Sequence, residues 1–246
     1  MDFLFQHRSV RQYKKDEIEN DLLNRIIEAG TRASTTGNMQ LYSVIVTREA
    51  GNKSRLAPLH FNQTAVVQAP VLLSICADVN RFSQWCASRN ADASFDHFLW
   101  LINAVIDAML FAQNICVAAE SQGLGICYMG TTLYNAAEIS EVLNLPAGVL
   151  PITTITMGYP ASEPGLTARL PVEAVVHYES YKDYSPERID GLYREQEALE
   201  SSRRFVEENK KENLAQVFTD VRYPAADSAH FSSTLIEVIR KKGFKI

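Results

Sequence analysis

A cationic pentapeptide near the start of the chain has the composition of an oxyanion-binding segment. It spans residues 7–11 (HRSVR) and combines a histidine, two arginines, a hydroxyl and several backbone N–H groups. An arginine guanidinium presents a planar fork that matches a phosphate, which a lysine ammonium does not. A short solvated basic segment is the simpler interpretation of these residues taken alone. Phosphate binding is therefore a hypothesis that depends on other residues lying beside them.

Two further polar stretches could contribute to the same kind of site. Residues 34–40 (STTGNMQ) are rich in hydroxyls and amides, which can hydrogen-bond the edge of a heterocycle. Arg169 follows Gly158 in a turn-rich stretch, EPGLTARLP, and could supply another cation. An ordinary polar loop and an incidental surface arginine are the alternatives. By composition alone these stretches indicate only polar loops that could converge on an anionic ligand.

The glycines of residues 123–131 (GLGICYMGT) do not form a standard nucleotide motif. Their spacing is G-x-G-x-x-x-x-G, whereas the dinucleotide fingerprint requires G-x-G-x-x-G between a strand and a helix. The sequence also lacks a Walker loop. A nicotinamide cofactor, if used, is therefore not expected to sit on a standard Rossmann unit. Gly130 would still allow a ligand to approach the backbone closely.

Composition limits the class of protein. The chain has 246 residues, of which 46% are hydrophobic, so it can bury a large core. A net charge of -5 argues against a nucleic-acid partner, which would require a basic face. The four cysteines show no C-x-x-C spacing, so neither a disulfide framework nor a zinc site is expected. The first residues lack the apolar segment of a signal peptide, and we expect a cytoplasmic protein with no membrane partner.

The hydrophobic pattern predicts strands alternating with helices, in an α/β or α+β sandwich whose sheet is covered by helices. Asp16 is the expected N-cap of the first long helix. A polar, poorly periodic stretch, 79–97, is expected to be a mobile connection. The predicted helices are 16–33, parts of 49–69, 98–119 ending at Gly123, and 135–143, and the predicted strands are 41–47, 71–77, 125–129 and 149–157.

The apolar stretch 98–119 is long enough to be mistaken for a membrane span. Polar residues, Asp107 among them, interrupt it, and a nearly all-apolar helix also suits the centre of a large core or a subunit interface. From about residue 180 the chain becomes highly charged and poor in aliphatic residues, with a last amphipathic segment at 231–240. We therefore predict a core at 1–180 and a helical extension at 181–246 that wraps over the core or another subunit.

Several of these segments, taken in order, carry a resemblance to a known family. HRSVRQY and ASTTGNMQLYSVIV resemble the N-terminal signature of the nitroreductase family. GLGICYMGTTLYNAAEISEVLNLPAGVLPITTITMGYP resembles its second signature, and the resemblance continues through PASEPGLTARLP to about residue 178. The charged tail is similar to that of the larger, NADPH-preferring flavin reductases and oxygen-insensitive nitroreductases.

The resemblance implies an α+β three-layer sandwich, with a mostly antiparallel sheet flanked by helices, in an intertwined homodimer that binds FMN at the subunit interface. It also implies a set of FMN contacts. They are His7, Arg8, Ser9 and Arg11 at the phosphate and ribityl chain, Ser34, Thr35, Thr36, Asn38, Gln40 and Gln63 around the flavin, Tyr128, Met129, Gly130 and Thr131 behind the ring, and Arg169 at the phosphate. Thr131 and Thr167 depart from the glycine and lysine common in the subgroup.

The function implied is an FMN-dependent oxidoreductase. Hydride would pass from NAD(P)H, with NADPH favoured, through FMN to nitroaromatic, quinone or flavin acceptors by a ping-pong scheme. No catalytic side chain is required, because the flavin carries the chemistry and the protein orients it. Arg203 and Arg204 could bind the 2′-phosphate of NADPH, or form a solvated helix face. The alternatives are a non-catalytic or redox-sensing FMN-binding protein, another FMN reductive chemistry such as dehalogenation, and an interaction protein with a degenerate site.

Overall fold

The computed structural model describes residues 2–246, with side chains from Leu4 onward, and its contacts divide the chain into two units. The core unit comprises the residues up to Gly165 together with Phe231–Ile246, and the tail unit comprises Leu166–His230. The sequence predicts a boundary near residue 180, which is later in the chain than the division after Gly165, and it predicts that residues 231–246 belong to the extension rather than to the core. The division into domains remains a prediction, and the two units are described separately here.

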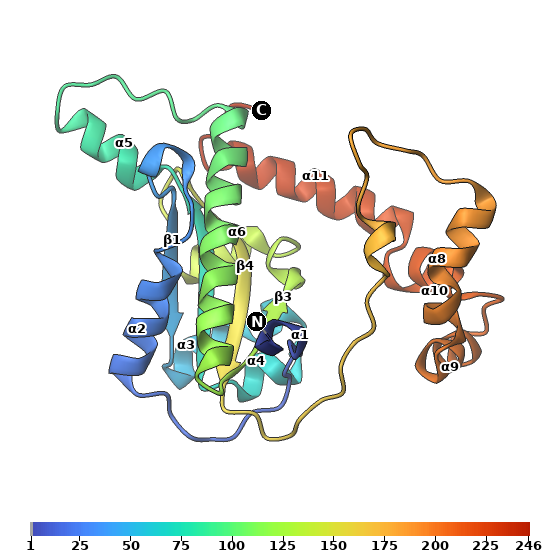
Figure 1. Cartoon of the computed structure of the whole chain (residues 1–246). Coiled ribbons are helices and arrows are strands. Elements are labelled where there is room, and N and C mark those ends of the chain that lie inside the picture. The colour runs from blue at the N-terminus through green and yellow to red at the C-terminus, as the bar shows by residue number, and fades with distance from the viewer. Residues whose placement is uncertain (1) are drawn as a thin grey trace. The chain divides into compact units, whose positions relative to one another are not determined.

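A four-stranded antiparallel sheet forms the centre of the core unit (Figure 1). Its strands are β1 (Tyr42–Thr47), β2 (Val71–Asp78), β3 (Gly125–Met129) and β4 (Val149–Gly158). They lie in the order β1-β2-β4-β3, and every neighbouring pair is antiparallel. Every residue of β2 and β4 is buried, as the apolar runs predict for central strands. β1 and β3 are therefore the two edges of the sheet.

Helices cover both faces of the sheet, which gives the predicted three layers. One hydrophobic cluster joins α2 (Asn20–Gly30) and α6 (Phe98–Ser121) to one face through Ile26, Phe111 and Leu73. A second cluster joins the other face to α3 (Ala50–Leu56), α4 (Thr64–Gln68) and α7 (Ala136–Val142). The remaining helical elements of this unit are α1 (Asp2–Phe5), η1 (Thr36–Asn38), η2 (Pro58–His60), α5 (Asn80–Ala87), η3 (Gly130–Thr132) and most of α11 (Ala225–Lys241).

The long helix α6 has one buried face and one exposed apolar face. By length and composition it could cross a membrane, but its Leu101, Ala104 and Ala108 pack into the core. A row of large apolar side chains on the same helix remains exposed. These residues, called the α6 stripe below, are Phe98, Leu99, Ile102, Ile106, Met109 and Leu110.

Two predictions about element boundaries were wrong. Helix α2 begins at Asn20, and Asp16 does not cap it. Arg48 hydrogen-bonds the carbonyl of buried Ile18 and the side chain of Asn20, so tertiary contacts hold the preceding residues outside the helix. The helix also ends at Gly30, short of residue 33.

The expected connection at 79–97 contains helix α5, which begins just after β2. Aromatic contacts account for it: Phe82 packs against Phe95 with ring centroids 5.0 Å apart, and Phe95 packs against Trp100 at 4.7 Å. Phe95 and Trp100 lie beyond the end of the helix, so the periodicity of the helix itself does not reveal these contacts.

The tail unit is built from short helices. They are η4 (Val172–Ala174), α8 (Pro186–Ala198), α9 (Glu200–Glu208), α10 (Leu214–Val217) and η5 (Phe218–Arg222). Ser185 caps α8 by accepting a hydrogen bond from the Arg188 N–H, and Pro186 occupies the first helical position. None of the three hydrophobic clusters found among the described residues includes a residue of this unit.

Candidate functional site

The cationic segment His7–Arg11 runs along the free edge of β3. The Val10 N–H donates to the Ile126 carbonyl at 2.9 Å, and Ser9 forms a bridge with the same strand residue. A Cβ at Gly125 would lie 2.6 Å from Val10 Cβ, so this glycine is required for the close approach. The segment is therefore fixed beside β3 by backbone contacts, independently of its charges.

Carboxylates pair with two members of this segment. His7 Nδ1 lies 2.7 Å from Glu120 Oε1 at the end of α6, and Arg8 forms an ion pair with exposed Glu163. Arg8 Nε is buried and has no hydrogen-bond partner among the residues that the structure describes. Arg11 is exposed and lies near Cys127, whose pKa burial raises and the Arg11 guanidinium lowers. The segment thus presents partly desolvated positive charge, which suits an anion.

Strand β3 leads from this segment into a wall formed by Tyr128–Thr131. The Tyr128 hydroxyl donates to Gln113 Oε1 at 3.3 Å, and burial raises the Tyr128 pKa, so the phenol stays neutral. Met129 is buried. Outside its chain neighbours and its own helical turn, no atom of the described residues lies within 4 Å of the position that a Cβ would take at Gly130. The backbone at Gly130 is consequently open to a flat ligand.

Two hydrogen bonds join η2 to the segment that runs from η3 to the start of α7. His60 Nδ1 lies 2.8 Å from Thr131 Oγ1, and Asn135 Nδ2 donates to the Leu59 carbonyl at 2.6 Å. Gln63 follows directly, with its N–H donating to the His60 carbonyl at 3.2 Å. These contacts bring Gln63 to the same region as Thr131. Sequence reasoning missed His60, although a histidine inside an apolar stretch is a signal for a buried, partnered ring.

The polar loop Ser34–Gln40 lies at the start of β1 and is fastened by a buried carboxylate. Asp107 Oδ1 accepts from Thr36 N at 2.9 Å and from Thr36 Oγ1 at 3.1 Å, and its Oδ2 accepts from Leu41 N at 3.2 Å. Gly37, Asn38 and Gln40 have positive φ angles of 56°, 55° and 55°. A left-handed backbone is unfavourable for the two non-glycine residues, so the surrounding bonds must hold this shape. Asp107 was noted in the sequence only as an interruption of the apolar helix.

Within one chain the predicted flavin contacts of the core unit fall into two groups. The edge cluster comprises His7–Arg11, Gln63 and Tyr128–Thr131 beside β3, and the polar loop lies beside β1, at the opposite edge of the sheet (Figure 1). Glu120 contacts the first group and Asp107 contacts the second. These two residues of α6 are 13 positions apart, which corresponds to ~20 Å along a helix. One chain alone therefore does not bring all of these contacts together.

The other predicted cations lie in the tail unit. Arg169 is exposed, and its guanidinium donates to the carbonyls of Thr167 and Ala168. Its role at a phosphate stays a prediction. Arg203 and Arg204 are exposed on α9, and Arg204 Nε lies 3.7 Å from Glu208.

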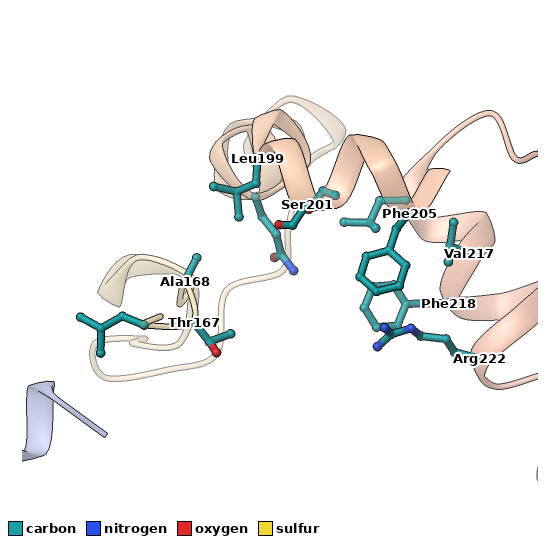
Figure 2. A pocket seen from close by; sticks show the side chains of 12 residues that line it. Thr167, Ala168, Leu199, Ser201, Phe205, Val217, Phe218 and Arg222 are labelled. Atoms are coloured by element: carbon teal, nitrogen blue, oxygen red, sulfur yellow. The ribbon is translucent and has the colours of Figure 1, made fainter. Parts of the chain in front are cut away.

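A pocket of about 440 Å³ lies within the tail unit (Figure 2). Its lining includes Arg222 rather than Arg203 or Arg204. The Arg222 guanidinium stacks over Phe205, 4.6 Å from the ring centroid, and lies 5.6 Å from that of Phe218. The predicted role of Arg203 and Arg204 at NADPH is untested by this geometry.

Comparisons with known proteins identify the family. Residues 4–159 match the family described as Nitroreductase family. The chain belongs to the nitroreductase family. This nitroreductase is 34% identical over 196 residues to an oxygen-insensitive NADPH nitroreductase of Salmonella typhimurium, covering 80% of each chain. It is 33% identical over 180 residues to an FMN reductase (NADPH) of Bacillus subtilis, covering 72% of each.

Solved structures agree with this assignment of fold. The nitroreductase superimposes on a crystal structure from Bacteroides fragilis with a TM-score of 0.99 and 49% identity, covering 100% of both chains. The predicted α+β fold with an antiparallel sheet between helices is thereby confirmed.

Proposed function

We propose that this nitroreductase is an FMN-dependent oxidoreductase that takes hydride from NAD(P)H and reduces nitroaromatic, quinone or flavin acceptors. The observation that carries the proposal is the edge cluster, in a chain whose relatives are named NADPH nitroreductase and FMN reductase. Cations lie beside β3, and the open Gly130 backbone and the Thr131 hydroxyl follow its end. The Gln63 amide follows η2, which the His60–Thr131 contact joins to this region.

The residues of the edge cluster fit FMN. Arg8 and Arg11 would hold the phosphate, since a guanidinium matches its oxygens, and the buried unpartnered Nε of Arg8 leaves a donor for an anion. Gly130 would admit the flat ring, because the space where a Cβ would stand is open. The Gln63 amide and the Thr131 hydroxyl would hydrogen-bond the ring edge. Glu163 would have to release Arg8 when the phosphate binds.

When bound, FMN supplies the two-electron hydride chemistry, and the chain supplies position and electrostatics. The arginines neutralise the phosphate and fix the cofactor at one end. Met129 is buried and Tyr128 stays neutral, so the wall behind the ring excludes water and adds no charge. The ring face away from this wall would receive NAD(P)H and the acceptor in turn, which is a ping-pong order. No side chain is assigned a proton-transfer role.

We also propose that the site is completed by a second copy of the chain. The polar loop carries five predicted contacts, yet it lies at the edge of the sheet opposite the edge cluster. The α6 stripe exposes six large apolar side chains on the helix that carries Asp107, the anchor of that loop. A two-fold dimer through this stripe would bring the polar loop of one protomer toward the edge cluster of its partner.

NADPH is the proposed donor, and the cytoplasm is the proposed location. The names of the relatives, an NADPH nitroreductase and an FMN reductase (NADPH), support this donor. All four cysteines are free and buried, which suits a reducing compartment.

Complementation between two defective subunits tests the shared site. Arg11→Glu reverses a charge of the edge cluster, and Ser34→Phe obstructs the polar loop; each homodimer should lose FMN. When the two variants are co-expressed, each heterodimer regains one intact site, and about a quarter of the wild-type flavin content should return. Flavin absorbance per protomer after gel filtration gives the result.

The matched control is co-expression of Arg11→Glu with Arg8→Glu, two defects in the same cluster. This pair should restore no flavin, because no arrangement of its subunits yields an intact edge cluster. If Arg11→Glu and Ser34→Phe also fail to complement while the wild-type protein binds FMN, each site belongs to a single chain.

A further inference from the structure

His60 is a fully buried side chain with one partnered and one unpartnered nitrogen. Its relative exposure is 0%, and its Nδ1 lies 2.8 Å from Thr131 Oγ1. Its Nε2 has no hydrogen-bond partner within the described part of the chain. Phe61 and Asn62, which follow, have positive φ angles of 55° and 51°. Such strain is retained where surrounding contacts hold it, and it concentrates at functional sites.

The imidazole of His60 is neutral near pH 7, because burial lowers its pKa to about 4. A neutral ring has one N–H donor and one acceptor nitrogen. With the proton on Nε2, a buried donor would lack an acceptor. With the proton on Nδ1, the ring donates to Thr131 Oγ1 and leaves only an unused lone pair. A buried N–H without an acceptor is rarer in proteins than a buried acceptor with an unused lone pair. This favours the Nδ1–H tautomer.

This tautomer determines what the Thr131 hydroxyl can do. If Oγ1 accepts from His60, its own hydrogen must be donated elsewhere. The only side-chain partner found for Thr131 among the described residues is His60. Thr131 is only partly buried, and it adjoins Gly130, whose backbone faces open space. The hydroxyl hydrogen is consequently available to a ligand against this wall.

We infer that His60 is a positioning residue that makes Thr131 a hydrogen-bond donor to the flavin and thereby raises the reduction potential of bound FMN. The inference rests on the proposed function, since it needs FMN at the edge cluster. Reduced flavin carries more electron density on its ring heteroatoms than oxidised flavin. A fixed donor therefore stabilises the reduced form more, and hydrogen bonds to the ring are one way in which a protein tunes its potential.

The midpoint potential of bound FMN tests the inference in a set of variants. Thr131→Val removes the hydroxyl and should weaken the relative stabilisation of reduced flavin about tenfold, a shift of ~30 mV to more negative potential for a two-electron couple. Thr131→Ser keeps the hydroxyl and should stay near the wild-type value. Thr219→Val, at a threonine of the tail unit that bonds only its neighbours, is the matched control and should leave the potential unchanged.

A double-mutant cycle separates positioning from packing. His60→Leu should also shift the potential negatively, and the His60→Leu/Thr131→Val variant should shift it no further than Thr131→Val alone. Nitrogen NMR of His60 in the FMN-free protein should show the proton on Nδ1. An unchanged potential in Thr131→Val, or additive shifts in the double variant, would overturn the inference while leaving FMN binding intact. A wild-type protein that binds no FMN would instead refute the proposed function.

Discussion

Asp107 fastens both ends of the polar loop, through Thr36 and Leu41, while Arg81 also donates to the Gln40 carbonyl within it. Asp107→Ala would leave the N–H groups of Thr36 and Leu41 without an acceptor. We expect the free energy of unfolding to fall by about 3 kcal/mol, the scale of one buried and one partly buried donor that lose their partner. Asp107→Asn keeps one acceptor oxygen and should lose less. Urea unfolding at fixed protein concentration measures both changes.

Asp92→Ala is the matched control for this prediction, because Asp92 is an exposed aspartate of the same unit. Its substitution should change the free energy of unfolding little. An Asp107→Ala variant as stable as Asp92→Ala would show that the loop does not depend on this carboxylate.

His60 should make the protein acid-sensitive in a defined range. Burial lowers its pKa from 6.5 to about 4 in the folded state, so between these values the unfolded chain binds a proton that the folded chain does not. The contribution of this neutral ring is complete above pH 6.5 and is lost as the pH falls toward 4, by about 3 kcal/mol in total. His60→Leu should remove this component, and unfolding measured at several pH values in both proteins checks it. Equal pH dependence of the two proteins would contradict the buried neutral ring.

Sequence reasoning found the residue types of the site but not the residues that hold them. The cationic segment, the polar loop and the open Gly130 follow from composition and family resemblance, because their chemistry is local. Asp107 and His60 act across 71 positions of the chain, on Thr36 and Thr131 respectively. A single sequence does not show which residue each of these side chains contacts, so their roles became visible only in the fold.

At the scale of elements, helix α6 contributes one face to the core and the other to the proposed dimer interface. Its buried face covers the sheet, while the α6 stripe exposes apolar side chains that a partner would cover. Ile106→Glu places a charge in that stripe and should shift the protein from a dimer to the 27.6 kDa protomer, with loss of FMN. Light scattering after gel filtration measures the mass.

Ser121→Glu is the matched control, because Ser121 is exposed on the same helix outside the stripe. It should leave the mass unchanged. A monomeric wild-type protein, or an Ile106→Glu variant that remains a dimer with bound FMN, would exclude the stripe as the interface.

The elements that sequence reasoning predicted well are those with a strong periodic pattern. The four strands and α6 were predicted within a few residues. The central strands β2 and β4 are buried on both faces and give continuous apolar runs, and α6 is a long, mainly apolar helix. The start of α2 and the existence of α5 were missed. Arg48 determines the first and the contacts of Phe82 determine the second, and neither is a local signal.

At the scale of the whole molecule, the fold of one chain separates residues that the proposed chemistry requires together. The edge cluster and the polar loop lie at opposite edges of the sheet. A sequence gives the order of residues along the chain, and it does not show which edge of a sheet meets a partner. The family resemblance implies a dimeric site, and the geometry supplies an independent physical reason for one.

The most direct test of the central claim is an anaerobic absorbance spectrum of the purified protein reconstituted with FMN, recorded before and after NADPH. The account predicts bound flavin bands that bleach with NADPH and return when a nitroaromatic or quinone is added. Bound flavin that NADPH does not bleach would contradict the reductase function and favour a flavin-binding protein. A protein that retains no flavin would contradict the site itself.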